Sequence, residues 1–305
     1  MTNETLLRKL QRPDKRVRAV LDTDAYNEID DQFAIAYMLK KTEVFDVQAL
    51  TAAPFSNNRA TDPGEGMKLS YDEIHKILAL MDREDMKPRV FEGSMTYLPD
   101  EQTPVESPAA KELVRLSTAA DNANPLYIIA IGAITNVASA LLIDPTMADR
   151  CVIVWLGGNA HHWRDTGEFN MAQDVAAARV VFGSGAPLVI LPCMGVVSSF
   201  TTTGPELRHW LSGKNALCDY LVQQTTDEAN TYAAGRVWSR VIWDVTAIAW
   251  LLNDGDKLLL DRLIPTPIPE FDDHYGFDPR RPLCRYVYHI NRDALFSDLF
   301  EKLSR

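Results

Sequence analysis

Short aliphatic runs alternate with longer, helix-forming stretches over most of this chain. The runs are almost continuously apolar, which is typical of strands covered on both faces in a parallel sheet. Strands are predicted at Val17–Leu21, Val47–Ala52, Leu126–Ile131, Val152–Leu156 and Leu188–Leu191. Helices are predicted between them at Asp31–Leu39, Gly66–Met81, Pro108–Ala119, Ile134–Leu142 and Asp174–Phe182. This alternation predicts an α/β fold with a mainly parallel sheet and helices on both of its faces.

The remaining segments are less regular. Glu92–Ser107 reads as a loop, Gly204–Asn253 as mostly helical, and Leu263–Pro282, with five prolines, as an irregular stretch before a late strand at Cys284–Ile290. The pattern contains no internal repeat, low-complexity tract or clear linker. We therefore expect one domain covering residues 1–305.

Composition narrows the functional classes. The net charge of −11 argues against a protein that binds the phosphate backbone of nucleic acids, since that needs a basic surface. No apolar run approaches the roughly 20 residues of a membrane span, and Met1–Arg18 lacks the apolar core of a signal peptide. The four cysteines show no Cys-x-x-Cys spacing, and Cys151 reads as a small buried hydrophobe. These features favour a reducing cytoplasm.

The most informative segment lies between the first predicted strand and helix. Within ten residues it carries five carboxylates: Asp22, Asp24, Glu28, Asp30 and Asp31. Open α/β sheets bind ligands at such strand-to-helix turns. Carboxylates this dense repel one another unless a cation offsets them, and oxygen ligands suit Ca²⁺ or Mg²⁺. The alternative is that Asp30 and Asp31 cap the helix while the others face solvent.

Four further segments follow predicted strands or precede predicted helices, so they can reach the same edge of the sheet. They are Ile131–Asn136, Leu156–Asn159 with the following His161 and His162, Glu168–Asn170, and Trp243-Asp244. Taken alone, these segments fit an ordinary turn or helix cap at least as well as a ligand site.

Taken in order, the motifs resemble one family. Asp-Thr-Asp at 22–24, Asp30-Asp31, Ile131-Gly-x-x-Thr-Asn136, Gly157-Gly158, Glu168-Phe-Asn170 and Asp244 are similar to those of nucleoside hydrolases of the inosine/uridine-preferring superfamily. The resemblance spans about residues 17–252. It implies a Rossmann-like core, a bound Ca²⁺, a homodimer or homotetramer, and hydrolysis of ribonucleosides to ribose and a free base.

The resemblance also implies roles for individual residues. Asp24 matches the aspartate that binds Ca²⁺ and acts as base toward water, and Ile131 matches the residue that lends its backbone carbonyl to the metal. Asp31 and Asp244 match the other metal ligands. Substrate contacts are implied for Asp22, Asp30, Asn57 or Asn58, Glu168 and Asn170. Negative charge near the sugar would stabilise an oxocarbenium-like transition state.

The chain departs from the family pattern in three places. Five residues separate the two acid pairs where the family has three, so Tyr26, Asn27 and Glu28 must bulge toward the substrate or away from it. The family's asparagine before the Glu-Phe-Asn motif has no clean match, and His162 falls nearest to it. Trp243 replaces the histidine that protonates the leaving base in many members, which resembles the purine-specific branch in which tryptophans stack on the base.

We therefore expect a Ca²⁺-dependent hydrolase of ribonucleosides, with purine nucleosides slightly favoured. One alternative is a hydrolase of a modified nucleoside or another N-riboside. A second is a ribose- or nucleoside-binding protein that has lost turnover, and a third is a Mg²⁺ phosphohydrolase built on a similar Asp-x-Asp turn. No membrane or nucleic-acid partner is expected.

Overall fold

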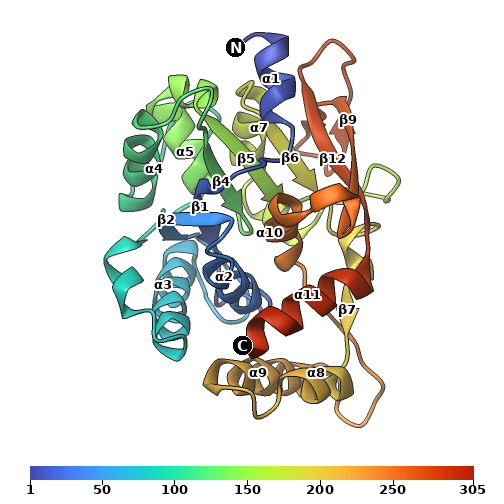
Figure 1. The fold of residues 1–305 in the computed structure, drawn as a ribbon. Helices are drawn as coiled ribbons and strands as arrows, with labels where there is room; N and C mark the ends of the chain where they lie inside the picture. The colour runs from blue at the N-terminus through green and yellow to red at the C-terminus, as the bar shows by residue number, and fades with distance from the viewer.

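The computed structural model describes residues 1–305 and is built around an eight-stranded sheet (Figure 1). Its order is β3-β2-β1-β4-β5-β6-β12-β9, and all neighbours pair in parallel except β12 with β9. The strands are β1 (Val17–Thr23), β2 (Phe45–Ala52), β3 (Val90–Phe91), β4 (Leu126–Ala130), β5 (Cys151–Leu156), β6 (Leu188–Leu191), β9 (Leu259–Pro265) and β12 (Leu283–Ile290). Two small pairs lie outside it, β7 (Thr201–Thr202) with β8 (Arg240–Val241) and β10 (Ile268–Pro269) with β11 (Tyr275–Gly276).

The α-helices are α1 (Asn3–Lys9), α2 (Asp31–Lys40), α3 (Pro63–Leu80), α4 (Pro108–Thr118), α5 (Thr135–Ile143), α6 (Phe169–Gln173), α7 (Val175–Gly183), α8 (Gly204–Leu211), α9 (Ala216–Ala233), α10 (Val245–Leu252) and α11 (Arg292–Ser304). Short 3-10 helices cover Glu84–Arg89, Pro145–Asp149, Val197–Ser199 and Asp254–Asp256. Each helix and strand predicted above is present, with boundaries that differ by at most three residues.

Alternate residues of the central strands point into two separate apolar cores, which explains their continuous hydrophobicity. In β4, Tyr127 and Ile129 join the core shared with α2, α3, α10 and α11, whereas Ile128 and Ala130 join the core under α4, α5 and α7. Figure 1 shows these two helix layers on opposite faces of the sheet, with α8 and α9 as a further layer outside the first. The predicted α/β fold is therefore confirmed.

One prediction about organisation was wrong. Leu263–Pro282 is not wholly irregular, because it contains the end of β9 and the small β10–β11 pair. β9 was missed because it is an edge strand with a charged, half-exposed pattern, and it pairs antiparallel to β12. Prolines are tolerated at such edges. Glu92–Ser107 is a loop, as predicted.

The topology explains where a ligand can bind. Chain connections run from β1 outward to β2 and β3 on one side, and from β4 to β5 and β6 on the other. The carboxyl ends of β1 and β4 therefore flank a topological switch point, where open α/β sheets form their binding crevice. No helix of the structure combines the length and apolar character that a membrane crossing requires. All four cysteines, Cys151 included, are buried and unpaired in disulfides.

Candidate active site

A cavity of about 200 Å³ opens at the carboxyl edge of the sheet. It is lined by six acids and by neutral residues from five segments of the chain: Asp24, Asn27, Glu28, Asp30, Asp31, Ile131, Leu156, Asn159, Gly167, Glu168, Phe169, Asn170, Cys193, Met194, Trp243 and Asp244. Eight of the twelve site residues expected from the sequence therefore meet at one cavity. The exceptions are Asp22, Asn57, Asn58 and His162.

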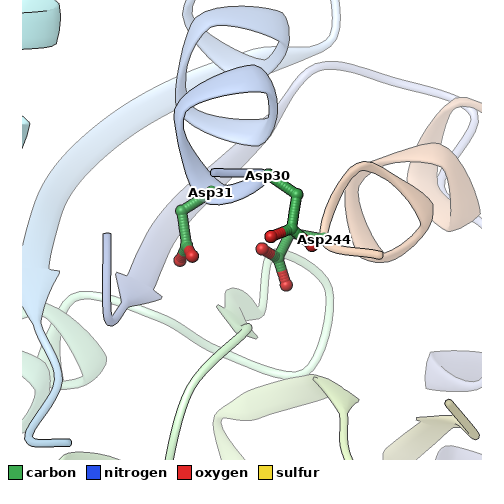
Figure 2. Close-up of side chains that lie close together, drawn as sticks. All are labelled: Asp30, Asp31 and Asp244. Atoms are coloured by element: carbon green, nitrogen blue, oxygen red, sulfur yellow. The ribbon is translucent and has the colours of Figure 1, made fainter. Parts of the chain in front are cut away.

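Three buried aspartates form the centre of the acid cluster. Asp30 and Asp31 come from the start of α2 and Asp244 from the residue before α10, and one carboxylate oxygen from each lies within 4.8 Å of the others. In Figure 2 the carboxyl groups of Asp30 and Asp244 face each other, and Asp31 points down beside them. The structure thus groups Asp30, expected to hold a ribose hydroxyl, with two of the expected metal ligands.

These aspartates do not serve as ordinary helix caps. The Asp30 side chain makes no capping hydrogen bond to α2, and the same is true of Asp244 at α10. The Asp30 carboxylate instead lies close to that of Asp244, and Asp31 accepts the hydroxyl of Thr23. The solvent-facing part of the alternative is excluded for Asp22 and Asp24, which are at most 1% exposed, whereas Glu28 is half-buried.

Asp24 has a free acceptor atom in the same cavity. Its carboxylate is buried, and Oδ2 has no hydrogen-bond partner. The backbone opposite it approaches closely, since a Cβ added to Gly132 would lie 2.9 Å from Cγ and Oδ1 of Asp24. A glycine is therefore required at the Ile131–Asn136 turn for Asp24 to occupy this position.

Burial and mutual repulsion perturb the whole cluster. Burial, reinforced by Asp30, raises the pKa of Asp31 to about 8. The pKa values of Asp24 and Asp244 are also raised, first by burial and then by the charges of neighbouring aspartates. Isolated carboxylates avoid such surroundings, because a buried charge without a partner is costly.

The opposite side of the cavity presents hydrogen-bonding groups. Asn170 donates its side-chain N–H groups to the carbonyls of Ile131, at 3.2 Å, and Leu156, at 3.0 Å. Glu168 accepts the backbone N–H groups of Gly158, Asn170 and Met171 at 2.7–3.1 Å as the N-cap of α6. Ile131 lines the cavity, and the second lone pair of its carbonyl oxygen is free for another donor or a cation.

Asp22 lies behind the cavity and supports it. It is fully buried, accepts the Thr51 hydroxyl at 2.6 Å and the Asn136 amide at 2.8 Å, and burial raises its pKa to about 6. Asn136 also donates to the carbonyl of Ala52. The Asp-Thr-Asp and Thr-Asn motifs are thus linked by hydrogen bonds beneath the site.

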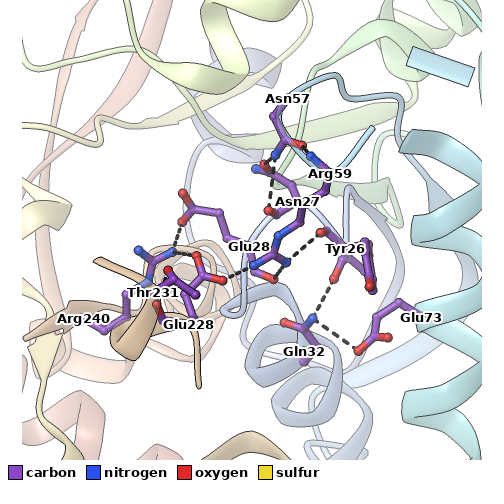
Figure 3. A network of polar contacts seen from close by, with 11 residues as sticks. Tyr26, Asn27, Glu28, Gln32, Asn57, Arg59, Glu73, Glu228, Thr231 and Arg240 are labelled. Carbon is purple, nitrogen blue, oxygen red and sulfur yellow. Dashed lines mark hydrogen bonds and ion pairs between the residues drawn. The ribbon is translucent and has the colours of Figure 1, made fainter. Parts of the chain in front are cut away.

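The bulge at residues 25–29 turns toward the cavity, with Asn27 and Glu28 in its wall. Figure 3 shows how it is held. Arg59 donates to the carbonyls of Tyr26 and Glu28 at 3.1 and 3.3 Å, and it pairs with Glu228 of α9. Arg240 pairs with the Glu28 carboxylate at 2.5 Å and lies 4.0 Å from Glu228. The bulge is therefore a fixed wall of the site.

Other expected contacts lie close to the cavity without lining it. Asn57 donates its side-chain amide to Asn27 at 2.8 Å, so it supports the bulge, whereas Asn58 is exposed. His162 is exposed and lies beside Gly195. Asn159, three residues earlier, lines the cavity in its place. The sequence signal for Asn159 was its position directly after Gly157-Gly158, where a predicted strand ends at the edge of the sheet that forms the site.

Trp243 is half-buried and lines the cavity, so this tryptophan faces the site. Two other tryptophans, Trp163 and Trp238, do not line it. Trp238 instead packs on Gly204.

The donor set fits a hard divalent cation. It offers three clustered carboxylates, the unpartnered Oδ2 of Asp24 and a backbone carbonyl, all of them oxygen ligands. A cation would also offset the repulsion that raises the pKa values of these acids.

Comparisons with known proteins agree with the geometry. The sequence model described as "Inosine-uridine preferring nucleoside hydrolase" matches residues 19–266. The chain is 28% identical over 219 residues to the pyrimidine-specific ribonucleoside hydrolase RihA of Salmonella enteritidis, covering 68% of this chain and 70% of RihA.

Two solved structures share the fold. The plant nucleoside hydrolase PpNRh1 has a TM-score of 0.74 at 21% identity, covering 96% of this chain and 99% of that one. The purine-preferring ribonucleoside hydrolase of Gardnerella vaginalis has a TM-score of 0.73 at 17% identity, covering 94% and 98%.

Proposed function

Since this chain belongs to the inosine-uridine preferring nucleoside hydrolase family and is a ribonucleoside hydrolase, an N-glycosyl hydrolase, we propose that its acidic cavity holds Ca²⁺ and the ribose of a nucleoside. One observation supports this most directly. The buried Asp30–Asp31–Asp244 cluster and the free acceptor of Asp24 share a single cavity with the sugar-binding candidates Glu168 and Asn170.

In the proposed site, Asp24, Asp31, Asp244 and the carbonyl of Ile131 hold the cation, with Asp30 beside them. When bound, Ca²⁺ supplies the positive charge that orients vicinal hydroxyls and makes a water easier to deprotonate. Asp30, Glu168 and Asn170 fix the ribose by hydrogen bonds, and Asp22 supports them from behind. Positioning of this kind contributes several kcal/mol to catalysis, on the order of 7 or more in well-oriented systems.

Asp24 is the proposed base. Its unpartnered Oδ2 accepts a proton from water as the oxygen attacks the anomeric carbon. The bond from that carbon to the nucleobase breaks, the nucleobase leaves with the bonding electron pair, and positive charge develops on the sugar. The surrounding carboxylates stabilise this charge in a water-poor cavity.

Trp243 supports a preference for purine nucleosides, because its ring lines the cavity and can stack on a planar base. Pyrimidine nucleosides are the second candidate, because the RihA relative is named as pyrimidine-specific. A modified nucleoside or another N-riboside is the third, because Asn27 and Glu28 of the bulge line the cavity.

The test is release of reducing sugar from inosine, guanosine, uridine and cytidine, with Ca²⁺ and after chelation. Release that stops on chelation and returns with Ca²⁺ supports the proposal, and the ranking of substrates assigns the base. Unchanged release after chelation, with no Ca²⁺ bound in calorimetry, contradicts the role of the metal.

Asp24→Ala is expected to abolish turnover, with a loss of at least about 10³-fold in kcat, because it removes both the base and a metal ligand. The fold should persist, since Asp24 contributes only an uncompensated buried carboxylate. Asp46→Ala, which changes a half-exposed acid of β2, is the control. Substantial activity in the Asp24 variant would refute the mechanism.

The proposal extends to assembly. Residues 1–305 are proposed to form a single domain, because the chain contains no clear linker, and by resemblance the protein is proposed to form a homodimer or homotetramer. Exposed aromatic side chains at Phe271, Phe277 and Tyr288 offer apolar area for such contacts. Light scattering coupled to size exclusion determines the assembly, and a monomer would refute this part.

A further inference from the structure

A buried amide side chain of α2 holds the first residue of the bulge. Gln32 is 3% exposed, and its Nε2 donates to the carbonyl of Ala25 at 2.7 Å (Figure 3). The same nitrogen donates to Oε1 of Glu73 on α3 at 3.3 Å. Gln32 does not line the cavity, so it can affect the site only through the groups that it holds.

The two ends of the Gln32–Ala25 hydrogen bond adjoin two acids of the site. Ala25 directly follows Asp24, and Gln32 directly follows Asp31. The bond therefore closes the stretch of chain that separates these acids and fixes its ends relative to each other. Asp31 also has a side-chain partner in Thr23, whereas Oδ2 of Asp24 has none. The place of Asp24 consequently depends more on how its backbone is held.

The amide of Gln32 can take only one orientation here. Both of its partners, the Ala25 carbonyl and the Glu73 carboxylate, are acceptors, so the NH₂ group must face them. Its Oε1 is then left buried with no hydrogen-bond partner. A buried oxygen without a donor lowers stability, so packing alone does not explain a glutamine at this position.

Glu73 is held in turn by its own contacts. It is 3% exposed, its Oε1 accepts the hydroxyl of Tyr220 from α9, and Lys76 lies 3.7 Å from its Oε2. The acceptor that faces Gln32 therefore has a defined position, and the amide between Glu73 and Ala25 has little freedom to rotate.

From these contacts we propose that Gln32 is a positioning residue, which sets the place of Asp24 relative to Asp31 through the Ala25 carbonyl while Glu73 orients its amide. The inference rests on the proposed function, in which Asp24 is the base and both acids hold Ca²⁺. Without the amide, the start of the bulge can shift and carry Asp24 with it. Small displacements of a reacting group cost large factors in rate.

The test is Gln32→Met, which keeps the length of the side chain and removes both hydrogen bonds. With the best of the four nucleosides and saturating Ca²⁺, we expect kcat to fall about tenfold or more. KM should change less, because Gln32 does not touch Asp30, Glu168 or Asn170. Calorimetry should show Ca²⁺ binding weakened by about tenfold, a readout that does not depend on turnover.

The matched control is Gln48→Met on β2. Gln48 is also partly buried, but its amide donates only to the carbonyl of Asp46, away from the site. It should keep the kcat and the Ca²⁺ affinity of the wild-type protein.

A second variant covers the case in which Gln32→Met does not fold. Gln32→Asn keeps the amide but is one methylene too short to reach both acceptors, so it should show the same losses. Glu73→Leu should lower kcat less, and the double variant Gln32→Met/Glu73→Leu should lose no more than Gln32→Met alone, because both act through one contact. Additive losses overturn the role given to Glu73.

The outcomes separate this inference from the proposed function. Wild-type kcat and Ca²⁺ affinity in Gln32→Met or Gln32→Asn, even with a lower unfolding temperature, show a merely structural role and overturn the inference alone. If the wild-type protein binds Ca²⁺ but releases ribose from no nucleoside, the proposed function fails, and equal Ca²⁺ affinities of wild type and variant then overturn the inference too. A wild-type protein that neither binds Ca²⁺ nor releases ribose refutes both.

Discussion

Single residues at this site are constrained by how closely the backbone approaches the acids. Gly132 shows this best, since the space for its missing Cβ is taken by Asp24 and by the Cβ of Ala53, 3.1 Å away. The glycine does not have an unusual φ, so contact and not backbone strain excludes larger residues.

Gly132→Ala should therefore displace the Asp24 carboxylate and lower kcat about tenfold or more, because small displacements of reacting groups cost large factors. Gly183→Ala is the matched control, since a Cβ there meets nothing within 4 Å. It should keep full activity and gain slightly in stability, by up to about 1 kcal/mol. Equal activity of the two variants would show that Gly132 does not position Asp24.

At the residue level, sequence reasoning found the acids but not all of their neighbours. Asp30, Asp31 and Asp244 could be predicted to meet because their motifs lie at the same sheet edge. The choice between His162 and Asn159 could not be made, because it depends on how the loop after Gly158, with φ of +69°, leaves the strand. The grouping of Asp30 with Asp244 depends on side-chain directions that spacing does not specify.

At the level of elements, the inserted bulge is defined by partners far away in the chain. Arg59, Glu228 and Arg240 come from three other segments and hold its carbonyls and its acid. No local pattern could show whether residues 26–28 turn inward, because the partners that decide it are up to 212 positions distant. The strands and helices themselves followed from local pattern.

Arg59→Ala should loosen the bulge without touching the acid cluster. We expect KM to rise more than kcat falls, and stability to drop by about 1–3 kcal/mol through loss of charge-assisted hydrogen bonds. Arg164→Ala, which removes a largely exposed partner of Asp165, controls for the loss of charge. Steady-state kinetics and thermal unfolding measure both effects, and an unchanged KM would show that the bulge is rigid without Arg59.

At the level of the whole molecule, acid stability depends in part on His161. Its ring lies among Tyr275, Phe277 and Tyr286, and its buried Nε2 has no partner. Burial, aided by the charge of Arg262, lowers its pKa to about 4. Since the unfolded chain binds a proton near pH 6.5, this histidine should reduce the stability of the fold as pH falls from 6.5 to 4.

His161→Phe should remove the part of the stability loss at low pH that this histidine causes. The wild-type protein should lose about 1–2 kcal/mol relative to the variant between pH 7 and pH 4, a value reduced from the full shift because the ring is not fully buried. Urea unfolding of both proteins across this range provides the measurement. Parallel stability curves would show that His161 does not carry the effect.

The attachment of the cavity wall to α9 has an evolutionary consequence. Glu228 contacts both arginines that support the bulge but does not itself line the cavity. A lineage that gained two residues in the acid turn also needed Arg59, Glu228 and Arg240, so we expect the four features to be inherited together. Substrate range in this branch can then drift through changes on a helix that never meets the substrate.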